Sequence, residues 1–204
     1  VPADGTGQPD TLAVGFIPTV SPDGEYLAYS QLRDSGGWFN ADIVVQPLSG
    51  GRTPEPTLLA RASEIQMDLR VAPDGEFAAY TSHESGRFEI YLTRFPSGEG
   101  RWQVSVDGGM WARWCDRGDR LYYTWNNDLF VVDVTLGASP GLSRPRLALA
   151  RPPLRVRTVA DWEPSFDVAG EDERFLFFRN PAAGATDRQI VVVQSWHSEF
   201  EDRE

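Results

Sequence analysis

The chain has 204 residues, of which 41% are hydrophobic and 24% are charged, a balance typical of a globular domain that buries a core. The formal net charge of −11, with a single basic cluster at 151–157, argues against the basic stripe that nucleic-acid binding requires. No run approaches the roughly 20 apolar residues that cross a bilayer, so no membrane span is expected.

The first recognisable unit begins with "GFIPTV" (15–20) and continues through "SPDGEYLAYS" (21–30). Pro22 presets φ for a turn, Asp23 can accept hydrogen bonds from the backbone, and Gly24 supplies the positive φ that the turn needs. The apolar, aromatic-rich run that follows is typical of a buried strand. Further strands are expected at 42–48 and 56–60.

Three similar units follow along the chain. The turn phrases of the four units are "SPDGEYLAYS" (21–30), "APDGEFAAYT" (72–81), "CDRGDRLYYT" (115–124) and "DVAGEDERFLFF" (167–178). Strands are expected before them at 65–71, 110–114 and 162–168, and after them at 88–95, 102–106, 128–134, 146–150 and 189–194. Cys115 replaces the Ser or Ala of the first two phrases, which indicates a small buried side chain.

The glycines Gly24, Gly75, Gly118 and Gly170 mark the register of the repeat, with separations of 51, 43 and 52 residues. Four antiparallel strands repeated at such a period predict the blades of a β-propeller. The fold class is therefore all-β, with about four blades at approximately 12–60, 61–106, 107–150 and 157–197 in one domain or domain fragment, 1–204.

The repeated "PDG" phrase resembles the WD-repeat-like propeller repeats of TolB-like proteins. "APDGEFAAYTSHESGRFEIYLTRFPSGEGRWQVSVDGG" with the following "WARW" and "LYYT", and the ending "QIVVVQSWHSEF" (189–200), are especially similar to the C-terminal propeller region of bacterial transmembrane serine/threonine protein kinases. The resemblance implies a propeller of about six blades, of which this chain is a part. It favours an extracytoplasmic location, in the periplasm or cell envelope, with a cytoplasmic one left open.

No sequence pattern makes a convincing catalytic or metal site. "GASPG" (137–141) matches G-x-S-x-G, but no helix is expected after it and Pro140 lacks the N–H of an oxyanion hole. His83 and His197 lack matching zinc ligands and are expected in exposed loops. Paired carboxylates such as those of 170–173 are common in an acidic chain. We therefore assign no catalytic residue, metal or cofactor.

Ligand binding is expected at one rim of the propeller, where the innermost strands begin and the loops between second and third strands gather. Aromatic side chains with a few polar neighbours suit the recognition of a protein, peptide or small ligand. The alternative for each Trp is packing between blades. The candidate residues are Trp38, Asp68, Arg70, His83, Trp111, Arg113, Trp125, Asn126 and Trp162.

The first functional interpretation is a non-enzymatic binding or scaffold module, at the sensor or protein-interaction end of a larger bacterial envelope or signalling protein. Arg70 and Arg113 would read acidic groups of the ligand. The second is the gating propeller of a prolyl-oligopeptidase-type serine peptidase, whose propellers share the repeat phrase. A third, a glycan lyase or glycosidase, has no decisive carboxylate motif. If the ring is open, exposed sheet edges favour self-association.

Overall fold

The structure is a computed structural model that describes residues 11–33, 40–48, 55–150, 152, 166–170, 174–179 and 189–193. Every regular element in these residues is a β-strand, and all strand pairs are antiparallel. The predicted all-β propeller fold is confirmed. Within this described part, no helix is long and apolar enough to cross a membrane.

The strands form four sheets in chain order. Sheet 1 consists of β1 (Phe16–Val20), β2 (Tyr26–Leu32), β3 (Ala41–Pro47) and β4 (Thr57–Ala60). Sheet 2 consists of β5 (Gln66–Val71), β6 (Phe77–Ser82), β7 (Glu89–Arg94) and β8 (Trp102–Gln103). Sheet 3 consists of β9 (Met110–Trp114), β10 (Arg120–Trp125), β11 (Asp128–Thr135), β12 (Gly141–Leu142) and β13 (Arg146–Leu149). Sheet 4 consists of β14 (Phe166–Ala169), β15 (Arg174–Arg179) and β16 (Gln189–Val193).

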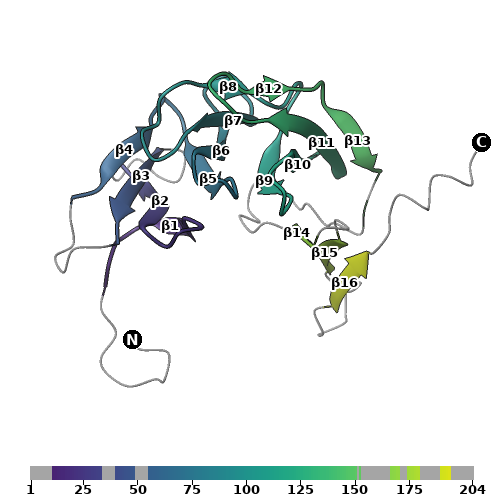
Figure 1. Cartoon of the computed structure of the whole chain (residues 1–204), viewed down its shortest axis with the longest axis horizontal. Coiled ribbons are helices and arrows are strands. Elements are labelled where there is room, and N and C mark those ends of the chain that lie inside the picture. The colour runs from purple at the N-terminus through teal and green to yellow at the C-terminus, as the bar shows by residue number, and fades with distance from the viewer. Residues whose placement is uncertain are drawn as a thin grey trace, which may run out of the picture.

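The four sheets follow one another along an arc, with the first strand of each sheet on the concave side (Figure 1). The first strands β1, β5, β9 and β14 contact their neighbours in turn along this side. Each pair of adjacent sheets encloses a buried apolar cluster: Ala28 and Ile43 meet Tyr80 between sheets 1 and 2, and Ile90 meets Leu121 between sheets 2 and 3. Burial on both faces explains why the strands read as continuous apolar runs.

The turn phrase has the same geometry in the first three sheets. The backbone N–H of Gly24, Gly75 and Gly118 donates to the carbonyl three residues earlier at 2.9 Å, and their φ values are between 72° and 74°. Asp23 and Asp74 accept the backbone N–H two residues later, also at 2.9 Å. These contacts confirm the roles predicted for the phrase, because only glycine adopts such φ values without strain.

The fourth turn differs from the register predicted by its glycine. In sheet 4, Ala169 pairs with Arg174, and Gly170 is the first residue of the connection between them. In sheet 2, the equivalent pair is Ala72 and Phe77, and Gly75 is the third residue of the connection. The register assigned through Gly170 was therefore wrong by two residues. A positive φ of 81° is still adopted at Gly170, but at a different place in the turn.

Candidate functional site

The first strands of sheets 1, 2 and 3 share an irregularity. Ile17, Asp68 and Trp111 each have a positive φ, of 49°, 50° and 60°, and each lies seven residues before its turn glycine. The pairing of these strands with their neighbours shifts register there, which is the mark of a β-bulge. A bulge changes the direction of a side chain, at the cost of backbone strain.

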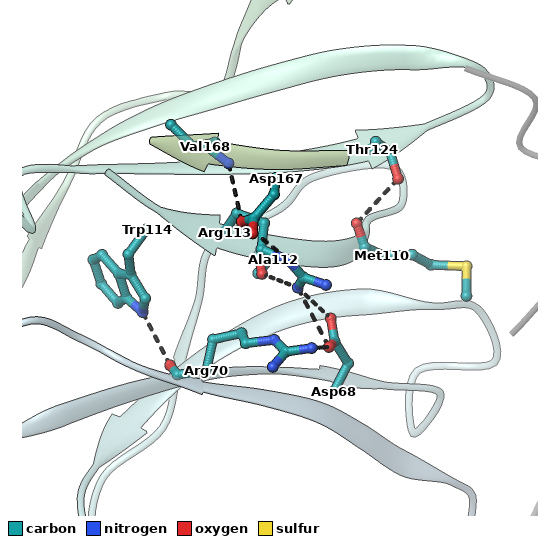
Figure 2. A network of polar contacts seen from close by, with 9 residues as sticks. All are labelled: Asp68, Arg70, Met110, Ala112, Arg113, Trp114, Thr124, Asp167 and Val168. Atoms are coloured by element: carbon teal, nitrogen blue, oxygen red, sulfur yellow. Dashed lines mark hydrogen bonds and ion pairs between the residues drawn. The ribbon is translucent and has the colours of Figure 1, made fainter. Parts of the chain in front are cut away.

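In sheet 2 the bulge residue is a carboxylate that is fully buried. Arg113 of β9 donates through Nη1 to both oxygens of Asp68, at 3.3 Å to Oδ1 and 3.0 Å to Oδ2. Arg70 of β5 places its Nη2 2.8 Å from Oδ1 of the same carboxylate. Figure 2 shows both guanidinium groups pointing toward Asp68. A buried charge is tolerated only when it is paired in this way.

The same arginine extends the network to sheet 4. Nε of Arg113 lies 3.9 Å from Oδ1 of Asp167 in β14, and its guanidinium lies 6.0 Å from the centre of the Phe166 ring. The indole N–H of Trp114 donates to the carbonyl of Arg70 at 3.0 Å, which adds a second link between β5 and β9 (Figure 2). The network therefore joins the first strands of three sheets and contains two arginines and two aspartates, whose charges balance.

The rim at the start of these strands is built around Trp125, at the end of β10. Asn126 and Asn127 form the tight turn into β11 with φ values of 49° and 69°, and both are exposed. The half-buried Trp125 ring lies against Gly108, where an added Cβ would come within 2.0 Å of Cε2 of the indole. The β8–β9 loop of sheets 2 and 3 is thereby held against the turn of sheet 3.

Charged side chains continue this rim into sheet 2. Arg87 places Nε 2.6 Å from Oε1 of Glu89 and Nη2 3.6 Å from Oδ1 of Asp107. The carboxylate of Glu89 is buried and also accepts the hydroxyl of Ser105, which in turn accepts the N–H of Ile90 at 2.7 Å. The loop that ends at Gly108 is thus fixed by contacts to β7 as well as by the Trp125 ring.

The structure divides the residues predicted to bind a ligand. Asp68 and Trp111 are buried, with 0% and 3% exposure, so neither offers a surface to a ligand. For Trp111, the structure favours the alternative interpretation, which is packing in the core. Arg70 and Arg113 are paired with Asp68 rather than directed at a bound acid. Trp38 and Trp162 lie outside the described residues.

His83, Trp125 and Asn126 are the predicted residues that lie at the accessible rim. His83 is half-buried rather than exposed, because its ring packs edge-on against Phe88 with centroids 4.7 Å apart. Sequence reasoning missed Glu89, Ser105 and Gly108. The sequence does carry a signal for Glu89. An acidic residue stands near the start of the third strand in each of the first three sheets, as Asp42, Glu89 and Asp128, at equivalent positions of the strand pairing.

Two other chemical patterns of the sequence lie within the described residues. "GASPG" occupies the connection after β11 and ends at Gly141, the first residue of β12, so a strand rather than a helix follows Ser139, which is exposed. Cys115 is buried as predicted, and its thiol donates to Oδ1 of Asp119 at 3.1 Å. Across the residues that the structure describes, no group of three His, Cys, Asp or Glu side chains is arranged to hold a metal ion. His197 falls outside them.

Neither family models nor curated proteins match the sequence. Several solved structures, however, are similar to this chain over most of its length. TolB from Acinetobacter baumannii is 18% identical with a TM-score of 0.60, over 88% of this chain and 40% of that one. A putative TolB from Agrobacterium tumefaciens is 16% identical with a TM-score of 0.54, over 87% of this chain and 60% of that one.

A puromycin-hydrolyzing peptidase from Mycobacterium tuberculosis is 19% identical with a TM-score of 0.59, over 87% of this chain and 26% of that one. The chain therefore spans less than two thirds of the length of each of these proteins. Identities this low establish the fold and leave the activity open. The arc of four antiparallel sheets is a TolB-like β-propeller fold.

Proposed function

We propose that this chain is a non-enzymatic binding module that takes a protein or peptide at the rim between sheets 2 and 3. The observation that supports it best is the combination of Trp125 and Asn126 with the 62% exposed Val106 and the charged pair Arg87 and Asp107. An aromatic anchor with an apolar neighbour and a polar margin is the usual composition of a protein-recognition patch.

The scaffold beneath this rim is suited to binding without rearrangement. Arg113 ties β9 to β5 through Asp68, and Gly108 is pressed against the Trp125 ring. Loops fixed by a rigid sheet lose little conformational entropy on binding, which favours affinity. This arrangement supports a recognition role.

The cellular role that we propose is the sensor or protein-interaction end of a larger bacterial envelope or signalling protein. The fold shared with TolB supports the envelope assignment, and the resemblance of the repeat to kinase-attached propellers supports signalling. A gating propeller is the second candidate, and the shared fold with a puromycin-hydrolyzing peptidase favours it specifically. A hydrolase domain encoded next to this chain would support the second candidate over the first.

Selection from a random peptide library displayed on phage tests the binding proposal. Peptides enriched on the immobilised chain should bind Trp125→Ala at least about tenfold more weakly, as expected for an aromatic anchor. Leu147→Ala is the matched control, because Leu147 is an exposed apolar residue of β13, on the convex side. Enriched peptides that bind Trp125→Ala and wild type equally would contradict the proposal.

A further inference from the structure

An exposed carboxylate stands at the rim between sheets 2 and 3. The side chain of Asp107 is 86% exposed, and its partner among the described residues is Arg87, whose Nη2 lies 3.6 Å from Oδ1. At this distance the contact is an ion pair but not a hydrogen bond. The oxygens of Asp107 are therefore open to a hydrogen-bond donor that a ligand brings.

The backbone holds this carboxylate next to an aromatic ring. Asp107 directly precedes Gly108, where an added Cβ would come within 2.0 Å of the Trp125 indole. The N–H of the following residue, Gly109, donates to the carbonyl of Phe88 at 2.8 Å, which ties the same segment to the start of β7. One short, anchored segment thus places a charged group one residue away from a half-buried tryptophan.

The net charge of this part of the rim is negative. Nε of Arg87 lies 2.6 Å from Oε1 of Glu89, so the arginine is already balanced by a buried carboxylate. One arginine then stands against the two carboxylates of Glu89 and Asp107. The formal charge of the whole chain has the same sign, at −11. Such a surface attracts a cation and repels an anion.

The two arginines that were expected to contact an acidic ligand do not reverse this preference. Arg70 and Arg113 both pair with the buried Asp68. Arg113 also lies 3.9 Å from Asp167. Their charges are therefore balanced within the first strands of the sheets, and the rim keeps its negative sign.

The surface around Asp107 is open because it lies at the end of two inner blades. Sheet 2 has sheets 1 and 3 as neighbours, and sheet 3 has sheets 2 and 4 (Figure 1). Val106 is 62% exposed, and Asn126 and Asn127 are exposed in the turn that follows Trp125. An extended peptide can therefore reach the carboxylate and the ring together.

We propose, on the basis of the binding function given above, that the partner of this rim is a peptide that presents an arginine side chain. The guanidinium pairs with the carboxylate of Asp107, and its flat face covers the exposed part of the Trp125 ring. Arginine suits these two groups better than lysine, because a planar guanidinium donates two parallel N–H groups to a carboxylate and stacks on aromatic rings.

Fluorescein-labelled nonapeptide amide libraries test the proposal with the whole chain immobilised. The central residue is arginine, lysine, citrulline or glutamate, and the other positions are randomised equally. The chain should retain the arginine library at least about tenfold more than the citrulline library, because citrulline has a similar shape without the charge. Retention of the lysine library should lie between these two, and the glutamate library should be retained least.

Two variants locate the contact. Asp107→Asn keeps a residue type that tolerates the φ of 67° and should reduce retention of the arginine library at least about tenfold. Asp133→Asn is the matched control, because Asp133 is a 55% exposed carboxylate at the other end of β11 and the same charge is removed from the chain. It should leave retention unchanged. Thermal unfolding verifies that both variants are folded.

The proposal is overturned if the arginine and citrulline libraries are retained equally, or if folded Asp107→Asn retains the arginine library like wild type. In either case, a loss of retention in Trp125→Ala would still support peptide binding at the rim, and only the preference for arginine would fail. Retention of no library, or equal retention by Trp125→Ala and wild type, would overturn the binding function as well.

Discussion

Arg113 of β9 binds both carboxylate oxygens of Asp68 in β5, at 3.3 and 3.0 Å, with the arginine side chain 8% exposed and the aspartate fully buried. The two residues are 45 positions apart and belong to neighbouring sheets. One ion pair therefore fixes the angle between two blades at their concave edge. Because Asp68 is out of water, removing Arg113 leaves this carboxylate with Arg70, at 2.8 Å, as the remaining cation of the described network.

Arg113→Met should lower the free energy of unfolding by about 1.5–3 kcal/mol, because Asp68 loses its charge-assisted hydrogen bonds from Arg113 and keeps only Arg70. Urea unfolding followed by tryptophan fluorescence measures the change. The double variant Asp68→Leu with Arg113→Met should recover part of the loss, since no buried charge then remains unpaired. Equal losses in the single and double variants would show that packing, and not charge, is responsible.

An exposed pair supplies the control for this prediction. Arg146 lies 3.4 Å from Asp133, and the two side chains are 48% and 55% exposed. Arg146→Met should therefore change the free energy of unfolding by about 1 kcal/mol or less, because water screens the pair. A loss similar to that of Arg113→Met would contradict the assignment of the large effect to burial.

The Asp68–Arg113 pair also shows which features of the fold a local sequence pattern cannot predict. The first two turns follow from Pro, Asp and Gly in fixed order, since each residue type has a local conformational reason to be there, and the third keeps the glycine, Gly118. The bulge at Asp68 has no such signal, because a positive φ at a residue other than glycine is imposed by its surroundings. Its partner is then decided by how two sheets pack, which a local pattern does not contain.

The same limit explains the error at the fourth turn. Gly170 resembles the other turn glycines, but the ladder from Ala169 to Arg174 places it two residues earlier.

The pKa of Asp23 is lowered, first by the hydroxyl of Ser21 and then by the backbone N–H of Glu25. Ser21→Ala should raise this pKa toward the ordinary value of 3.8, as followed by carbon-13 NMR of the carboxyl group. A lowered carboxyl pKa stabilises the folded state above the unfolded pKa. The advantage of wild type over Ser21→Ala should therefore be present near neutral pH and disappear as the pH falls through the native pKa.

Ser21→Thr provides the comparison for that titration, because it keeps a hydroxyl at the same position. Its Asp23 pKa should stay close to that of wild type. A pKa that rises equally in Ser21→Thr and Ser21→Ala would assign the shift to the turn backbone instead of the hydroxyl.

Burial raises the pKa of the Cys115 thiol, and its hydrogen bond to Asp119 raises it further. The thiol should therefore stay protonated and inaccessible in the folded chain, because the thiolate is the reactive form. Ellman's reagent at about pH 8 should label it only after denaturant is added. Cys115→Ala should cost about 1 kcal/mol or less, since Ala72 holds the same position in sheet 2. Rapid labelling of the native chain would contradict this assignment.

Gly108 connects the β8–β9 loop to the rim, and it cannot carry a side chain there. Its φ is 117°, and a Cβ would come within 2.0 Å of the Trp125 indole. Gly108→Ala should cost about 1–3 kcal/mol in backbone strain and displace the ring, which thermal unfolding and the tryptophan emission maximum would report. Peptides that depend on Trp125 should lose affinity for this variant.

Gly137→Ala is the matched comparison, because Gly137 lies in an exposed connection where an added Cβ meets nothing within 4 Å. It should leave the emission maximum, the thermal midpoint and the affinity of rim peptides close to those of wild type. If Gly108→Ala destabilises the chain while the rim peptides still bind with wild-type affinity, then the position of the Trp125 ring does not govern recognition. The binding surface would in that case have to be sought elsewhere on the propeller.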